Sequence, residues 1–211
     1  MFQKLIEYLE KLFKKLLGVR EEGLEKRLSK DSKEDNNQSK GVVMTEVREF
    51  VKKNDMWVDF DPKDISDEIK VRLEITRSKV NLLLAEAPEE LTKLVIVQRG
   101  WRSPEKNTSV GGVLNSPHES GEGIDIRELK FSKQELAKWC AKNQNLLKKH
   151  GLYLEDPAVT VGNFTDWCHL QTRPTKLGNV VFMPYSYTGY NSSKESVSQK
   201  WWSDLGVKRP F

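Results

Sequence analysis

Two of the three histidines in this chain stand near carboxylates, in segments without helical periodicity. His118 precedes Asp125 by seven positions, and His169 follows Asp166 by three. Two imidazole nitrogens and one carboxylate oxygen make a suitable ligand set for Zn²⁺, leaving the fourth tetrahedral position for water. His118, Asp125 and His169 could supply this set. Zinc would then lower the pKa of the bound water toward roughly 7 and polarise a carbonyl.

The spacing of the first two candidate ligands requires a turn between them. Gly121 and Gly123 lie in this interval, and glycine adopts backbone conformations that other residues avoid. A seven-residue separation can therefore bring both side chains to one ion. Such a reaction also needs a carboxylate outside the ligand set to move protons.

Each histidine also has a structural interpretation. A histidine and an aspartate seven positions apart are common in proteins without a metal, and His169 beside Trp167 and Leu170 is equally typical of a half-buried histidine. His150 follows two lysines and precedes Gly151. We interpret His150 as a charge at the C-terminal end of a helix, and as structural.

The composition sets limits on size and class. The chain has 211 residues, of which 37% are hydrophobic and 31% are charged, enough for one compact domain with an appendage. Lys and Arg total 35 against 31 acidic residues, and the net charge of +4 is too scattered to indicate nucleic acid as a partner. No apolar stretch approaches the roughly 20 residues of a membrane-spanning helix. The two cysteines, Cys140 and Cys168, form no Cys-x-x-Cys motif.

The N-terminal part differs from the rest. Residues 1–20 are predicted to form an amphipathic helix, because apolar residues recur every three or four positions along 2–17. Acidic residues interrupt this stretch, so it is not a secretory signal. The helix could lie on a membrane surface, pair with a partner helix, or fold back on the domain. Residues 21–40 form a polar linker, and 41–211 form the main domain.

Local signals within the main domain predict an α+β fold. We expect helices over 45–53, 66–85 and 132–149, a turn at Asp61-Pro62, and strands over 94–97 and around 166–172 and 179–183. Ser132 and Glu135 form a capping box for the third helix, and Gly151 ends it.

Several motifs occur together in a particular order. A strand leads into Gly100-Trp101-Arg102-Ser103-Pro104, and then follow Val110-Gly111-Gly112, Ser116-Pro117-His118, Asp125-Ile126 and Trp167-Cys168-His169. Over roughly residues 45 to 185 this order resembles the zinc D-Ala-D-Ala carboxypeptidases and the L-alanyl-D-glutamate endopeptidases of phage lysins. These enzymes share a fold with the hedgehog signalling domain.

The resemblance implies a small antiparallel sheet with packed helices and a zinc-dependent peptidase that cuts peptidoglycan stem peptides, at a terminal D-Ala or between L-Ala and D-Glu. It also implies site roles, which are zinc ligation by His118, Asp125 and His169, acid/base catalysis by Asp166, and a catalytic role of Arg102, which binds substrate or stabilises the oxyanion. We expect Ser116 to contact the substrate as well. If Asp166 is not the base, Glu119 and Glu155 are the next carboxylates to test. The alternative is a non-catalytic, metal-containing module of the cell wall or virion on the same fold. We expect a cytoplasmic enzyme until its release to the wall, or a virion-associated one.

Some positions depart from the family pattern or stay open. Gly123 stands where many relatives carry alanine, and Glu122 stands where arginine or lysine is common. Cys168 adjoins a candidate ligand, but neighbouring residues on a strand point to opposite faces, so we expect a buried thiol. Whether Cys168 pairs with Cys140, and whether Trp201-Trp202 and Phe211 pack on the domain or contact glycan, is left open by the sequence.

Overall fold

The computed structural model describes residues 49–57, 65–128, 134–158, 167–175, 178–182 and 192–209. The predicted N-terminal helix and linker lie outside these ranges, as do Asp61-Pro62, Ser132, Asp166 and Phe211. Apart from the capping box of Ser132 and Glu135, the expectations for those positions stay predictions.

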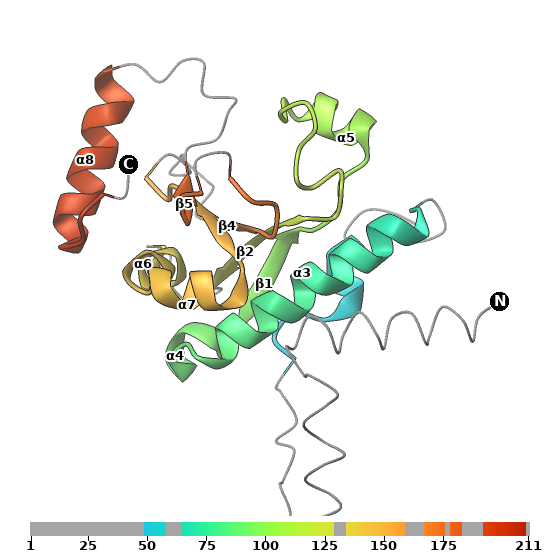
Figure 1. The fold of residues 1–211 in the computed structure, drawn as a ribbon, viewed down its shortest axis with the longest axis horizontal. Coiled ribbons are helices and arrows are strands. Elements are labelled where there is room, and N and C mark those ends of the chain that lie inside the picture. Colours follow the sequence, from blue (N-terminus) through green and yellow to red (C-terminus); the bar gives the residue numbers. More distant parts are fainter. Residues whose placement is uncertain are drawn as a thin grey trace, which may run out of the picture. The chain divides into compact units, whose positions relative to one another are not determined.

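A five-stranded sheet forms the centre of the described domain (Figure 1). Its order is β1 (Val95–Arg99), β2 (Gly123–Glu128), β4 (Cys168–Gln171), β3 (Tyr153–Glu155) and β5 (Val181–Phe182). The α+β prediction is confirmed. The first four strands in this order pair antiparallel, whereas β5 pairs parallel with β3, so the sheet is mixed and not wholly antiparallel.

The long helix α3 (Asp67–Ala85) confirms the helix predicted over 66–85. Ser66 caps it by accepting a hydrogen bond from the Ile69 backbone N–H at 3.4 Å. Its buried side chains, among them Leu73, Val80 and Leu84, join the hydrophobic core. Burial of this apolar stripe holds α3 against the sheet.

The single helix predicted over 132–149 is two helices, α6 (Glu135–Lys142) and α7 (Gln144–His150). The break falls at Asn143, whose side chain donates to the Trp139 carbonyl at 2.8 Å. Asparagine side chains compete with helical backbone bonds in this way. The predicted capping box of Ser132 and Glu135 is wrong, because α6 begins at Glu135 and its N-cap residue is Gln134. Glu128 caps the helix instead, by accepting from the Glu135 backbone N–H at 2.8 Å. Gly151, at φ 60°, ends α7 as predicted.

The helix predicted over 45–53 is wrong in its described part. Residues 49–52 are not helical, and a 3₁₀ turn, η2, spans Lys53–Trp57 instead. Asn81 of α3 accounts for the difference, because its Oδ1 accepts from the backbone N–H groups of Phe50 at 3.0 Å and Val51 at 2.8 Å. A tertiary contact therefore occupies the donors that a local helix would use.

Three described helices were not predicted, namely α4 (Glu89–Thr92), α5 (Pro104–Ser109) and α8 (Ser192–Leu205). The indole of Trp202 in α8 is buried and donates to Asp156 Oδ1 at 3.0 Å. Trp202 therefore packs on the domain and is not available to a glycan.

The two faces of the sheet differ in their environment, because one of them packs against the hydrophobic core. Ile124 and Ile126 of β2 and Leu170 of β4 belong to the core with side chains of α3, α6 and α7, and Figure 1 shows these helices grouped beside the strands. The alternate residues of β2 and β4 point to the opposite face. Among the described residues, no helix combines the length and apolar composition needed to cross a membrane.

Candidate metal centre

Strand register brings two of the predicted ligands together. Asp125 of β2 lies directly opposite His169 of β4 in the antiparallel ladder. Opposite residues in such a ladder share a face of the sheet. Asp125 and His169 therefore meet on the face that the core does not use, although 44 positions separate them in the chain.

The third predicted ligand comes from the loop before β2. At Gly121 the backbone adopts φ +78°, and a Cβ there would lie 2.8 Å from the Ile69 carbonyl oxygen. Thr76 of α3 donates to the Gly121 carbonyl at 3.0 Å. The loop is thus pressed against α3, and its return carries His118 back toward Asp125, as the sequence predicts.

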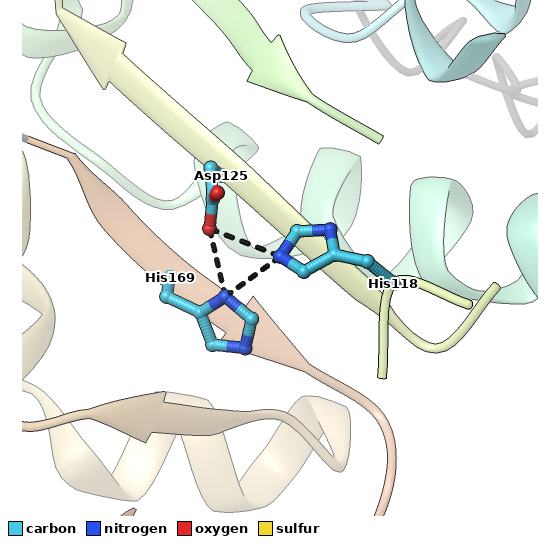
Figure 2. A group of neighbouring side chains, drawn as sticks. All are labelled: His118, Asp125 and His169. Carbon is cyan, nitrogen blue, oxygen red and sulfur yellow. Dashed lines mark hydrogen bonds and ion pairs between the residues drawn. The ribbon is translucent and has the colours of Figure 1, made fainter. Parts of the chain in front are cut away.

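Three polar atoms converge at the centre (Figure 2). Asp125 Oδ1 lies 2.7 Å from His169 Nδ1 and 3.4 Å from His118 Nε2, and the two ring nitrogens are 3.2 Å apart. Ligand atoms around a tetrahedral zinc with bonds of 2.0–2.1 Å lie about 3.3 Å apart. Within the described ranges, these buried side chains form the group that could hold a metal ion. Their chemistry and spacing fit zinc.

Each imidazole has a second contact that orients it. His118 Nδ1 lies 2.7 Å from the Gly100 carbonyl oxygen, so Nδ1 carries the proton and the lone pair of Nε2 faces the centre. The His169 ring interacts with the side chain of Gln171. Gln171 Nε2 donates to the Arg173 carbonyl at 2.7 Å, which leaves Gln171 Oε1 to accept from His169 Nε2.

Burial and charge act in opposite directions on these groups. Burial lowers the pKa of His118, with Asp125 opposing the shift. Burial would raise the pKa of Asp125, but the charges and hydrogen bonds of both histidines hold it well below its usual range. Burial would also lower the pKa of His169, yet Asp125 and Glu155 raise it. The carboxylate is therefore ionised and suited to a cation.

Arg102 lies at the edge of this centre. One terminal nitrogen, NH2, is 3.8 Å from Asp125 Oδ2, and NH1 donates to Asn107 Oδ1 at 3.1 Å. Burial lowers the pKa of Arg102 and Asp125 raises it, but an arginine stays protonated in either case. Its Nε is buried and has no hydrogen-bond partner in the part of the chain that the structure describes.

The other predicted site residues take different places. Ser116 is buried, and its hydroxyl accepts from the His118 backbone N–H at 3.3 Å. Asp166 lies outside the described residues, and β4 begins two positions later, at Cys168. Glu155 ends β3 close enough to the centre for its charge to raise the pKa of His169, while burial raises its own pKa. Glu119 instead accepts from Asn107 Nδ2 at 2.5 Å.

Three neighbours of the site were not predicted from the sequence, namely the Gly100 carbonyl, Gln171 and Asn107. Gln171 could have been found, because a residue two positions beyond His169 on a strand shares its face. The other two had no local signal.

The structure also shows the contacts of the remaining histidine, His150, and of the two cysteines. His150 pairs with Glu86 at the end of α7, away from the three candidate ligands, which agrees with a structural role. Cys168 is buried in the core, as predicted, and its Sγ lies 4.0 Å from Cys140 Sγ. Both thiols are free.

Comparison with known proteins gives a match to a protein family. The sequence model of the peptidase M15 family matches residues 65–162, and no curated protein and no solved structure matches the chain. The matched segment includes Arg102, His118 and Asp125 but ends before His169. The approach of His169 to the other two candidates is therefore an observation separate from the match.

Proposed function

We propose, from the match of residues 65–162 to the peptidase M15 family of zinc peptidases, that the protein hydrolyses the stem peptides of peptidoglycan. The observation that carries the proposal is the convergence of His118, Asp125 and His169 within hydrogen-bonding distance on one face of the sheet. The family match alone would fit a chain that had lost its metal ligands. The intact, buried ligand set supports an active enzyme.

In this proposal His118, Asp125 and His169 hold the zinc ion. Their donor atoms fit the ion in type and spacing, and the Gly100 carbonyl and Gln171 keep both rings in the tautomer that a ligand needs. Bound zinc supplies Lewis-acid chemistry, which makes water a stronger nucleophile at neutral pH and polarises a carbonyl.

The remaining roles fall to two residues outside the ligand set. Asp166 takes a proton from the attacking water and later gives it to the leaving amine, a role proposed from the family resemblance. Arg102 binds a carboxylate of the substrate or the oxyanion that develops on the cleaved carbonyl. Its buried Nε without a partner among the described residues supports this role, because an unpaired buried donor is costly unless a ligand satisfies it.

Two bonds in the stem peptide are candidates, the one before a terminal D-Ala and the one between L-Ala and D-Glu. Both substrates present a carboxylate near the bond that is cut, and a guanidinium suits either. We also propose that the protein acts like a phage lysin, reaching the wall on release from the cell or as part of a virion. Mass spectrometry of purified virions and of the released lysate would distinguish these two routes.

The test is incubation of the zinc-loaded full chain with purified muropeptides, with and without a chelator, followed by mass spectrometry of the products. We expect zinc-dependent cleavage, and the product masses identify the bond. His169→Ala serves as an inactive control, and His150→Ala as an active one. Intact muropeptides after incubation with the zinc-loaded protein would favour the non-catalytic module instead.

A further inference from the structure

Asn107 of α5 is a buried polar residue beside the site. Its hydrogen bonds determine which way the side-chain amide is turned. Its Nδ2 donates to the Val113 carbonyl at 2.7 Å and to Glu119 Oε1 at 2.5 Å. Its exposed fraction is only 2%. Because both neighbours of Nδ2 are acceptors, the side-chain oxygen must be the atom that faces Arg102.

Gly112 leaves room for the Asn107 side chain. A Cβ at Gly112 would lie 1.9 Å from Asn107 Oδ1, so only glycine fits there without displacing the amide. The Gly112 backbone N–H also donates to the Asn107 carbonyl at 2.8 Å. Gly112 of the Val110-Gly111-Gly112 motif therefore leaves the space that the Asn107 side chain occupies.

The backbone of Arg102 is hydrogen-bonded to the loop that carries His118, but its guanidinium group is not. The Arg102 backbone N–H donates to the His118 carbonyl at 3.2 Å, and the Trp101 indole donates to the Glu119 carbonyl at 2.9 Å. These bonds fix the start of the side chain. Among the described residues, the guanidinium of Arg102 donates one hydrogen bond, from NH1 to Asn107 Oδ1.

This one bond decides which edge of the guanidinium is left for a ligand. With NH1 held by Asn107, the edge that carries Nε and NH2 remains, and this edge can bind two oxygens of a carboxylate side by side. NH2 lies toward the centre, 3.8 Å from Asp125 Oδ2. Without Asn107, the guanidinium would be free to swing toward Asp125 or toward solvent.

We propose that Asn107 is a positioning residue that sets the orientation of Arg102 for the substrate, a role that rests on the proposed peptidase function. Asn107 does not touch the reacting atoms and acts only through Arg102. Its effect on catalysis therefore depends on the presence of that arginine.

A double-mutant cycle tests this dependence, with zinc content and thermal unfolding measured for every variant. Asn107→Ala should lower kcat/KM on a muropeptide by about ten- to hundred-fold, as expected for loss of a hydrogen bond to a charged group. In an Arg102→Ala background the same change should have an effect of less than about twofold. The matched control is Ser109→Ala, an exposed position on the same helix. Equal losses in both backgrounds would overturn the proposal.

A second pair of variants separates positioning from support of the loop. Asn107→Asp combined with Glu119→Gln exchanges donor and acceptor between the two side chains but keeps an oxygen facing Arg102. Compared with Glu119→Gln alone, this combination should retain kcat/KM within about threefold. A loss as large as that of Asn107→Ala would assign Asn107 to support of the Val113 segment and contradict the proposal.

One readout does not need peptidase activity. Phenylglyoxal modifies accessible guanidinium groups, and peptide mapping follows the reaction at Arg102. We expect faster modification of Arg102 in Asn107→Ala than in the unchanged protein or in Ser109→Ala. Equal rates would refute the positioning role. If the unchanged protein cleaves no muropeptide, the proposed function fails, while this measurement still decides whether Asn107 holds Arg102.

Discussion

Asp125 and His169 face each other in register across β2 and β4, with Asp125 Oδ1 2.7 Å from His169 Nδ1. The pair is therefore held by the ladder of backbone hydrogen bonds between two strands and not by flexible loops. Sites built on strands keep their geometry more accurately than sites on loops. Only His118 is delivered by a loop, and this loop is pressed against α3 at Gly121.

The first prediction concerns metal binding. Single changes of His118, Asp125 or His169 to Ala should each remove most of the bound zinc, because two ligands cannot complete a stable site. Elemental analysis of the purified variants gives the stoichiometry. His150→Ala should bind zinc like the unchanged protein. Zinc at full stoichiometry in all three ligand variants would show that the ion binds elsewhere.

The second prediction concerns the support of His169. Gln171→Leu keeps the volume of the side chain but cannot accept the ring proton, so the zinc affinity should fall by about 10- to 100-fold. Competition with a chromogenic chelator measures this change. Gln171→Glu retains an acceptor and should bind zinc more tightly than Gln171→Leu. Unchanged affinity in Gln171→Leu would mean that the ring orientation does not depend on this contact.

The third prediction concerns proton transfer. Asp166→Asn removes the basic oxygen, and the rate of peptide cleavage should fall by about 10²- to 10⁴-fold while zinc stays bound. Muropeptide cleavage and zinc content measured on the same preparation test this directly. Glu155→Gln is the comparison, because Glu155 is the described carboxylate outside the ligand set whose charge acts on His169. A fully active Asp166→Asn variant with an inactive Glu155→Gln variant would transfer the role to Glu155.

The fourth prediction concerns the anchor of α8. Asp156 is buried and accepts from Ser198 Oγ at 2.7 Å and from Trp202 Nε1 at 3.0 Å. The Ala158 backbone N–H donates to the same carboxylate at 3.1 Å. Asp156→Ala would therefore leave three buried donors unpaired and lower the free energy of unfolding by about 3 kcal/mol. Urea denaturation measures the loss. Asp204→Ala, at an exposed ion pair on the same helix, should change it by no more than about 0.5 kcal/mol.

Because of Asp156, we also expect the stability of the folded protein to depend on pH. Burial raises its pKa in the folded protein, although the hydrogen bonds from Ser198 and Trp202 oppose the shift. The folded state therefore holds this proton more tightly than the unfolded chain. The corresponding stability is fully present below the unfolded pKa and is lost as the pH rises through the folded pKa. Asp156→Asn cannot ionise, so its stability relative to the unchanged protein should increase over that interval.

The sequence by itself determined the elements with strong local signals and the identity of the chemical groups. The amphipathic pattern of the segment was enough to predict α3, and the apolar run after Lys93 was enough to predict β1. The residue types and order of His118, Asp125 and His169 indicated a metal site, because few residue types bind zinc and only three histidines occur. These are properties of side-chain chemistry and short-range spacing.

Only the tertiary structure decided which groups surround those ligands. The pairing of Asp125 with His169 depends on the register between strands that are distant in the chain. The nonhelical segment before Lys53 depends on Asn81, and the orientation of Arg102 depends on Asn107 and on the space left by Gly112. Each of these relationships is a long-range packing or hydrogen-bonding contact, and such contacts leave no periodic signal in the sequence because they form only when the sheet and its helices assemble.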